Sequence, residues 1–168
     1  MKTYWTLANL FSLGNAACGL ISLFFSFSRD FILAALLLLA AVAFDFLDGK
    51  TARFFKQDSL FGKGLDSLSD ITSFGIAPAF LGYALSPHRS ILELSLLLLF
   101  VLAGIWRLAY FFQWKKPERP PGMPITLNGI IFPALFFFHS GEKIFLIFFI
   151  LSFCAMVIPI FLKNEPVS

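Results

Sequence analysis

Long uncharged stretches alternate along the chain with short segments that carry the charged residues. Six windows contain no Asp, Glu, Lys or Arg: residues 3–28, 31–44, 71–88, 94–106, 120–141 and 144–162. A helix needs about 20 apolar residues to cross the hydrocarbon layer of a bilayer. The windows 31–44 and 94–106 reach that length only if their helices continue through the charges at their ends. The pattern therefore predicts six membrane helices: roughly 5–27, 31–54, 65–86, 90–112, 124–139 and 143–162.

The composition excludes an ordinary soluble domain. Of the 168 residues, 58% are hydrophobic and 14% are charged, whereas soluble domains carry about 25% charged residues. The apolar runs are continuous and rich in Leu, Phe and Ala, without the alternation that a membrane β-barrel requires. We therefore expect an all-α integral membrane protein, with residues 1–168 forming a single transmembrane domain.

The distribution of Lys and Arg predicts how the protein sits in the membrane. Six spans place both termini on one side, together with the second and fourth connections. Most of the 13 basic residues fall on that side: Lys2, Lys50, Arg53, Lys56, Lys63, Arg107, Lys115, Lys116, Arg119 and Lys163. Because basic residues stay in the cytoplasm, both termini should be cytoplasmic. The net charge of +3 would then face anionic membrane lipids, and we expect no nucleic-acid partner.

Acidic residues are concentrated on two neighbouring predicted helices. One helix carries two aspartates and two small residues at i, i+3, i+4 and i+7, which share a face: Asp45, Asp48, Gly49 and Ala52. The next helix carries a repeat at every fourth residue: Gly62, Asp66 and Asp70. Because a short connection makes the two helices antiparallel, we expect their acidic sides to face each other near the cytoplasmic end.

Four carboxylates in a membrane need compensation. Each costs about 2.5–3.5 kcal/mol at a helix centre, and together they also repel one another. Four negative charges match two divalent cations, and an oxygen-only ligand set suits Mg²⁺, Mn²⁺ or Ca²⁺ better than zinc. Two such ions serve phosphoryl transfer. Arg53 offers a planar fork suited to a pyrophosphate, and the absence of a Walker loop argues against ATP.

The residues from Asp45 to Asp70 follow the string D-x2-D-G-x2-A-R-x8-G-x3-D-x3-D without a mismatch. This string resembles the signature of the CDP-alcohol phosphotransferase family of integral membrane enzymes, and the six-span layout agrees with it. The resemblance implies phospholipid biosynthesis, in which a second alcohol attacks a CDP-activated alcohol, usually CDP-diacylglycerol, and CMP is released. It also implies two divalent ions, Mg²⁺ or Mn²⁺, a homodimer, and a multi-pass location in the cell membrane with the active site facing the cytoplasm.

The same likeness implies roles for particular residues. Four aspartates would be metal ligands: Asp45, Asp48, Asp66 and Asp70. Asp70 would also act as the general base that takes the proton from the attacking hydroxyl. Five residues would bind the CDP-lipid: Asn9, Gly49, Ala52, Arg53 and Ser59.

Flanking segments bear on the acceptor alcohol. Four of them look like the phosphatidylserine synthase branch of the family: residues 9–15, 67–79, 107–111 and 122–126. Serine is then the expected acceptor and phosphatidylserine the product, with Arg107 binding the serine carboxylate. Tyr110 stands where that branch commonly has Arg, and no Asn follows Phe111. An ether-linked lipid donor would give the same pattern.

Two alternatives remain open at this point. The first has the same chemistry with another acceptor, glycerol 3-phosphate or inositol phosphate, whose phosphate would favour several basic side chains beside Asp70. The second is an ion-coupled transporter, which also uses intramembrane aspartates but places them near the midplane on broken helices.

Overall fold

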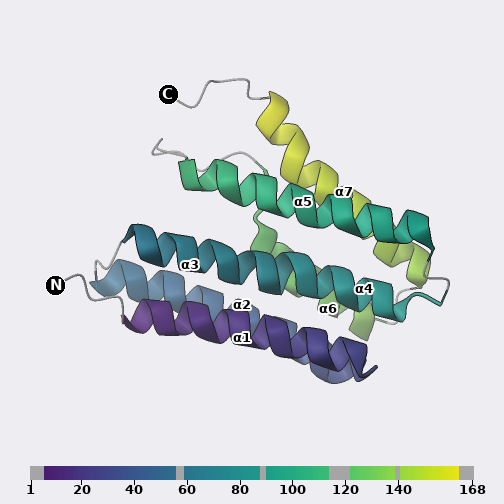
Figure 1. The fold of residues 1–168 in the computed structure, drawn as a ribbon, viewed down its shortest axis with the longest axis horizontal. Helices are drawn as coiled ribbons and strands as arrows, with labels where there is room; N and C mark the ends of the chain where they lie inside the picture. The colour runs from purple at the N-terminus through teal and green to yellow at the C-terminus, as the bar shows by residue number, and fades with distance from the viewer. Residues whose placement is uncertain (1–5, 56–58, 88–89, 114–121, 139–140, 163–168) are drawn as a thin grey trace.

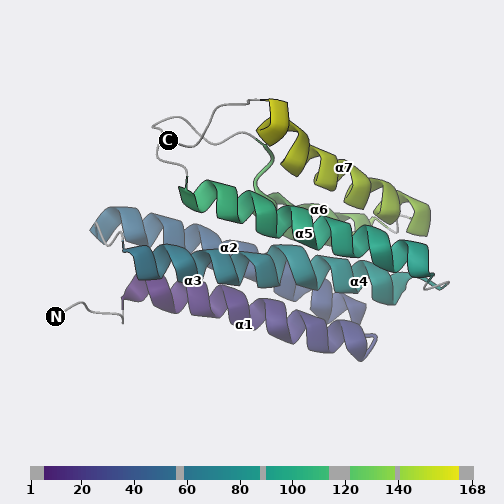
Figure 2. The same ribbon diagram turned by 45° about the horizontal axis from the view of Figure 1, so that its top comes forward.

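The protein is a bundle of long helices that lie side by side (Figures 1 and 2). The computed structural model describes residues 6–55, 59–87, 90–113, 122–138 and 141–162. In chain order the elements are α1 (Leu7–Phe27), α2 (Phe31–Phe55), α3 (Leu60–Asp70), the π-helical η1 (Ile71–Ile76), α4 (Ala77–Leu85), α5 (Ile91–Gln113), the 3₁₀-helical η2 (Ile125–Leu127), α6 (Asn128–Phe137) and α7 (Glu142–Leu162). Within these described ranges there is no strand, as the sequence predicts. The basic segment 114–121, with Lys115, Lys116 and Arg119, lies outside them.

Five of the helical stretches are long and apolar enough to cross a membrane: Leu7–Phe27, Phe31–Phe55, Leu60–Leu85, Ile91–Phe112 and Lys143–Phe161. The remaining predicted span, 124–139, forms the shorter apolar helix Ile125–Phe137. At 1.5 Å per residue that helix is about 20 Å long, less than the roughly 30 Å of hydrocarbon. The all-helical class is therefore confirmed within the described ranges, and five helices of sufficient length and apolarity support a membrane protein. The six-span count and the cytoplasmic termini stay predictions.

The third long helix begins earlier than predicted, at Leu60 instead of residue 65. Two glycines near its start, Gly62 and Gly64, weaken the helical signal in the sequence. The structure compensates with an N-cap, because Ser59 Oγ accepts a hydrogen bond from the Gly62 amide at 2.9 Å. α3, η1 and α4 then continue as one rod (Figure 1), and the extra turn brings Gly62 and Asp66 onto the same helix face.

The face that α1 buries is made of small and polar residues: Ala8, Asn9, Ser12, Asn15, Gly19, Ser22 and Ser26. Such residues let membrane helices approach closely, because bulky side chains do not separate the backbones. A Cβ atom on Gly19 would overlap Ser73 Oγ and lie 2.8 Å from the Ser73 Cα, which shows how tightly α1 packs on η1. Ser22 Oγ adds a hydrogen bond to the Ala34 carbonyl on α2, at 2.9 Å. This packing brings the polar face of α1 against both acid-bearing helices.

An aromatic core joins α5, α6 and α7. Phe132 stacks on Phe149 with ring centroids 4.1 Å apart, and Phe100 meets Phe149 edge-on at 4.9 Å. All three side chains are almost completely buried, and α2 packs against α6. The aromatic core therefore supports the acid-bearing helix α2 through α6.

Candidate metal and nucleotide site

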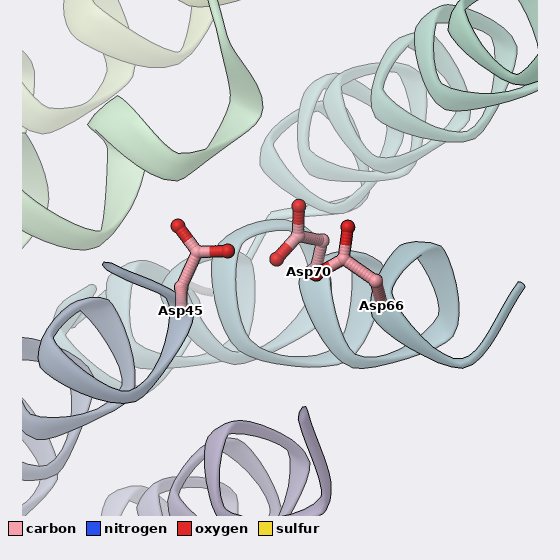
Figure 3. Close-up of side chains that lie close together, drawn as sticks. All are labelled: Asp45, Asp66 and Asp70. Carbon is pink, nitrogen blue, oxygen red and sulfur yellow. The ribbon is translucent and has the colours of Figure 1, made fainter. Parts of the chain in front are cut away.

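Three of the four predicted metal ligands converge. One carboxylate oxygen each of Asp45, Asp66 and Asp70 lies within 4.8 Å of the others. Asp66 and Asp70 project from α3 toward Asp45 on the neighbouring α2 (Figure 3). Asp70 is buried, and Asp45 and Asp66 are partly buried. The antiparallel pairing predicted from the sequence thus brings together carboxylates that are separated by up to 25 positions.

This geometry fits a divalent cation. Oxygen ligands of one Mg²⁺ lie about 3 to 4 Å apart, given Mg–O distances of about 2.0–2.1 Å. The oxygens of the three aspartates, which lie within 4.8 Å of one another, would have to approach slightly more closely to bind one ion. A carboxylate oxygen of Asp45 and one of Asp70 lie within 4.8 Å of each other, an approach that two unscreened negative charges resist. A cation between them would remove that repulsion.

Asp48 lies outside this group of three. It is buried on the same α2 face, and its carboxylate accepts a hydrogen bond from Ser12 Oγ on α1. Asp48 does line the adjoining cavity together with Asp45 and Asp66. The structure therefore brings Asp48 to the site but gives it a different partner from the other three acids.

A cavity of about 570 Å³ adjoins the acids between α1, α2, α3 and the end of α5. All five residues predicted to bind the CDP-lipid line it: Asn9, Gly49, Ala52, Arg53 and Ser59. The cavity wall also includes Lys63 and Ser67 from α3 and Phe111 and Phe112 from α5. It therefore offers carboxylates, two basic groups and aromatic rings in one space, the mixture that a nucleotide with a pyrophosphate and bound cations would need.

Small residues give the cavity its shape. A Cβ atom on Gly62 would lie 3.0 Å from Asn9 Oδ1 and 3.1 Å from Ser59 Oγ, so a side chain there would push into both neighbours. Arg53 folds back along α2, where its Nε donates to the Gly49 carbonyl at 2.8 Å. That bond orients the guanidinium along the α2 face that bears the aspartates.

Arg107, the predicted acceptor-binding residue, does not belong to the wall of this cavity. It is 7% exposed on α5 and interacts electrostatically with Asp70. Its Nη2 donates to the Gly122 carbonyl at 3.5 Å, and its Nε has no hydrogen-bond partner among the described residues. Gly122 has φ +97°, and a Cβ there would lie 2.9 Å from the Met156 carbonyl, so glycine is required at this turn.

Several contacts to the acids were not predicted from the sequence. Ser12 donates a hydrogen bond to Asp48, Asn15 Nδ2 donates to Asp70 Oδ1 at 3.2 Å, and the Thr126 side chain lies close to Asp45. The helical spacing of Ser12 and Asn15 from Asn9 could have indicated these two contacts, because residues 9, 12 and 15 lie on the same side of α1. Thr126 carried no such signal, because only the tertiary fold brings η2 against α2.

Known proteins resemble this chain over nearly its whole length. Residues 5–162 match the model of the family described as CDP-alcohol phosphatidyltransferase. A Helicobacter pylori protein named CDP-diacylglycerol–serine O-phosphatidyltransferase is 32% identical over 161 residues, covering 89% of this chain and 68% of the relative. An archaetidylserine synthase of Methanothermobacter thermautotrophicus is 40% identical over 139 residues, 81% of this chain and 60% of the relative. A Bacillus subtilis protein with the same name as the Helicobacter one is 29% identical over 133 residues, 78% of this chain and 75% of the relative.

Proposed function

The chain belongs to the CDP-alcohol phosphatidyltransferase family, and we propose that it transfers a phosphatidyl group from CDP-diacylglycerol to L-serine, forming phosphatidylserine and CMP. The observation that carries the proposal is the convergence of Asp45, Asp66 and Asp70 beside the cavity lined by Gly49, Ala52 and Arg53. Two relatives named as serine phosphatidyltransferases and one archaetidylserine synthase support serine as the acceptor.

In this proposal the cavity holds the CDP group and the acids hold two divalent cations, Mg²⁺ or Mn²⁺. The cations would neutralise the phosphates and the charge that develops during transfer. Arg53 and Lys63 line the same cavity and add positive charge for the pyrophosphate. The glycine and alanine on α2 leave room for the donor to approach the helix backbone.

Asp70 is the proposed general base. It would take the proton from the serine hydroxyl as the hydroxyl oxygen forms a bond to the lipid-bound phosphorus. The bond from that phosphorus to the bridging oxygen of CMP breaks, and CMP leaves with the bonding electron pair. Burial of Asp70 and its place among the other acids suit this task, because water is excluded and the carboxylate is held in position.

Arg107 is the proposed partner of the serine carboxylate. Arg107 is buried and near enough to Asp70 to interact with it electrostatically. Its Nε has no hydrogen-bond partner among the described residues, so this group could bind an acceptor. One guanidinium can bind one carboxylate through two parallel hydrogen bonds. The acceptors glycerol 3-phosphate and inositol phosphate carry a phosphate and would gain from further basic groups beside Asp70.

The proposal extends to the setting of the enzyme. We propose a multi-pass protein of the cell membrane, a homodimer, with the acids and the cavity opening toward the cytoplasm. The first turn of α1 and the junction of α2 and α3 lie at one end of the bundle (Figure 1). Arg53 and Lys63 lie at that same end, which fits the retention of basic residues in the cytoplasm.

One assay tests the function directly. Purified protein is given CDP-diacylglycerol and, separately, serine, glycerol 3-phosphate, inositol phosphate or no acceptor, with Mg²⁺ or with EDTA, and CMP release is measured. We expect release that depends on both serine and Mg²⁺. Release only with a phosphorylated acceptor would replace serine in the proposal. Solute transport without any CMP release would support the ion-coupled transporter instead.

The donor is tested in the same assay, since a relative is named archaetidylserine synthase. A CDP-activated lipid with ether-linked chains replaces CDP-diacylglycerol at equal concentration. We expect the ester-linked donor to give the higher kcat/KM. The reverse order would assign the chain to ether lipids and leave the serine acceptor unchanged.

A further inference from the structure

Asn15 on α1 holds the segment that contains the proposed base at two points. The Asn15 side chain has no exposed surface, and its Nδ2 donates to Asp70 Oδ1 at 3.2 Å. Its main-chain carbonyl accepts a hydrogen bond from Ser73 Oγ at 2.8 Å. Asn15 on α1 is therefore hydrogen-bonded both to Asp70 and to the first turn of η1.

Close packing next to these contacts keeps α1 in register with the acid-bearing rod. Gly19, one helical turn beyond Asn15, lies so near Ser73 that an added Cβ would be 2.8 Å from the Ser73 Cα. The π-helical η1 starts directly after Asp70, and π-helical turns are frequent at functional sites. A shift of α1 along η1 would break this contact, so the distance between Asn15 and Asp70 is fixed by packing.

Stability alone does not account for an asparagine at this position. Asn15 Oδ1 is buried and has no hydrogen-bond partner among the described residues, which lowers stability. An apolar side chain at this position would avoid that loss. The amide is also neutral, so it can orient a carboxylate without cancelling the charge that attracts a cation, unlike a Lys or Arg.

We propose that Asn15 is a positioning residue, which fixes the orientation of the Asp70 carboxylate for cation binding and for accepting the proton. The proton-accepting part rests on the proposed function. The cation-binding part rests only on the geometry of the acids. Residues that hydrogen-bond to metal ligands commonly change metal affinity or activity by 10- to 100-fold when mutated.

The test compares Asn15→Leu with a matched control, Ser22→Ala. Ser22 is also fully buried on α1 and also makes one hydrogen bond to a neighbouring helix, but it contacts no acid. Mn²⁺ affinity of the purified full-length chain is measured by electron paramagnetic resonance, and kcat and KM by CMP release. We expect Asn15→Leu to weaken Mn²⁺ binding and to lower kcat, each by about 10- to 100-fold, with an unchanged KM for CDP-diacylglycerol. Ser22→Ala should keep the wild-type Mn²⁺ affinity.

A second variant decides the question if Asn15→Leu does not fold. Ser73→Ala removes only the hydrogen bond to the Asn15 carbonyl, and we expect Mn²⁺ affinity to fall about 2- to 10-fold. Mn²⁺ binding by folded Asn15→Leu as tight as that of Ser22→Ala would overturn the proposal, as would unchanged binding by Ser73→Ala. If the wild-type protein releases no CMP, the proposed function fails, and the Mn²⁺ comparison still decides the role of Asn15.

Discussion

The Ser12 hydroxyl on α1 donates a hydrogen bond to the Asp48 carboxylate on α2, while Asp48 stays outside the group formed by Asp45, Asp66 and Asp70. The four aspartates of the sequence signature are therefore not equivalent in this structure. The carboxylates of three converge, whereas the fourth lines the cavity and accepts its own hydrogen bond from Ser12. We expect Asp48 to contribute a ligand atom to a second cation.

This difference predicts the stoichiometry of metal binding. We expect wild-type protein with CDP-diacylglycerol to bind two Mn²⁺ ions, and Asp48→Ala to bind one, because the three-carboxylate group remains intact. Asp66→Ala should lose the tighter ion, since it removes one of only three converging carboxylates. Titration followed by electron paramagnetic resonance measures both. Two ions bound by Asp48→Ala with wild-type affinity would contradict a ligand role for Asp48.

Asp70→Asn separates proton transfer from binding. The amide keeps the shape of the side chain but cannot serve as a base, so CMP release should fall by about 10²- to 10⁴-fold. The dissociation constant for CDP-diacylglycerol should remain within a few-fold of wild type. Asp30→Asn is the control, because Asp30 is exposed in the α1–α2 turn, where it accepts a hydrogen bond from the Leu33 amide. Near-normal CMP release by Asp70→Asn would exclude Asp70 as the base.

Arg107→Ala tests the acceptor site. Loss of a charge-assisted hydrogen bond costs about 1.5–3 kcal/mol, so the KM for serine should rise about 10- to 100-fold while the KM for CDP-diacylglycerol stays constant. Arg107→Lys should recover only part of the loss, because lysine cannot bind a carboxylate through a planar fork. Steady-state kinetics with each substrate varied in turn gives both constants. An equal rise in the two KM values would assign Arg107 to the structure of the site instead.

Gly19→Ala tests the close approach of α1 and η1. The added methyl group would overlap Ser73 Oγ and lie 2.8 Å from the Ser73 Cα, and overpacking of this kind costs about 1–3 kcal/mol. Gly64→Ala is the matched control, because nothing lies within 4 Å of the Cβ it would add. We expect a lower thermal unfolding midpoint in detergent for Gly19→Ala and an equal or higher one for Gly64→Ala. Equal midpoints for Gly19→Ala and wild type would mean that the helices are free to separate there.

Much of the candidate site could be predicted from the sequence because its residues follow helical spacing. Helical spacing alone places four residues on one face of α2: Asp45, Asp48, Gly49 and Ala52. The connection from α2 to α3 is short, so α3 must run antiparallel to α2. The start of α3 was less predictable, because Gly62 and Gly64 disfavour helix locally while the Ser59 cap and the packing against Asn9 favour it. The local sequence shows the low helix propensity of the two glycines, but the stabilising cap and packing become visible only in the folded structure.

The sequence by itself determined the membrane class, the acid-bearing helices and the family, because hydrophobic length and residue spacing are local properties of the chain. Only the tertiary structure decided that Asp48 pairs with Ser12, that Asn15 reaches Asp70 and that Thr126 reaches Asp45. Those contacts join helices far apart in the sequence, and they depend on how closely small residues such as Gly19 and Gly62 let the helices approach. Closeness between helices is a property of the packed bundle, so no single segment encodes it.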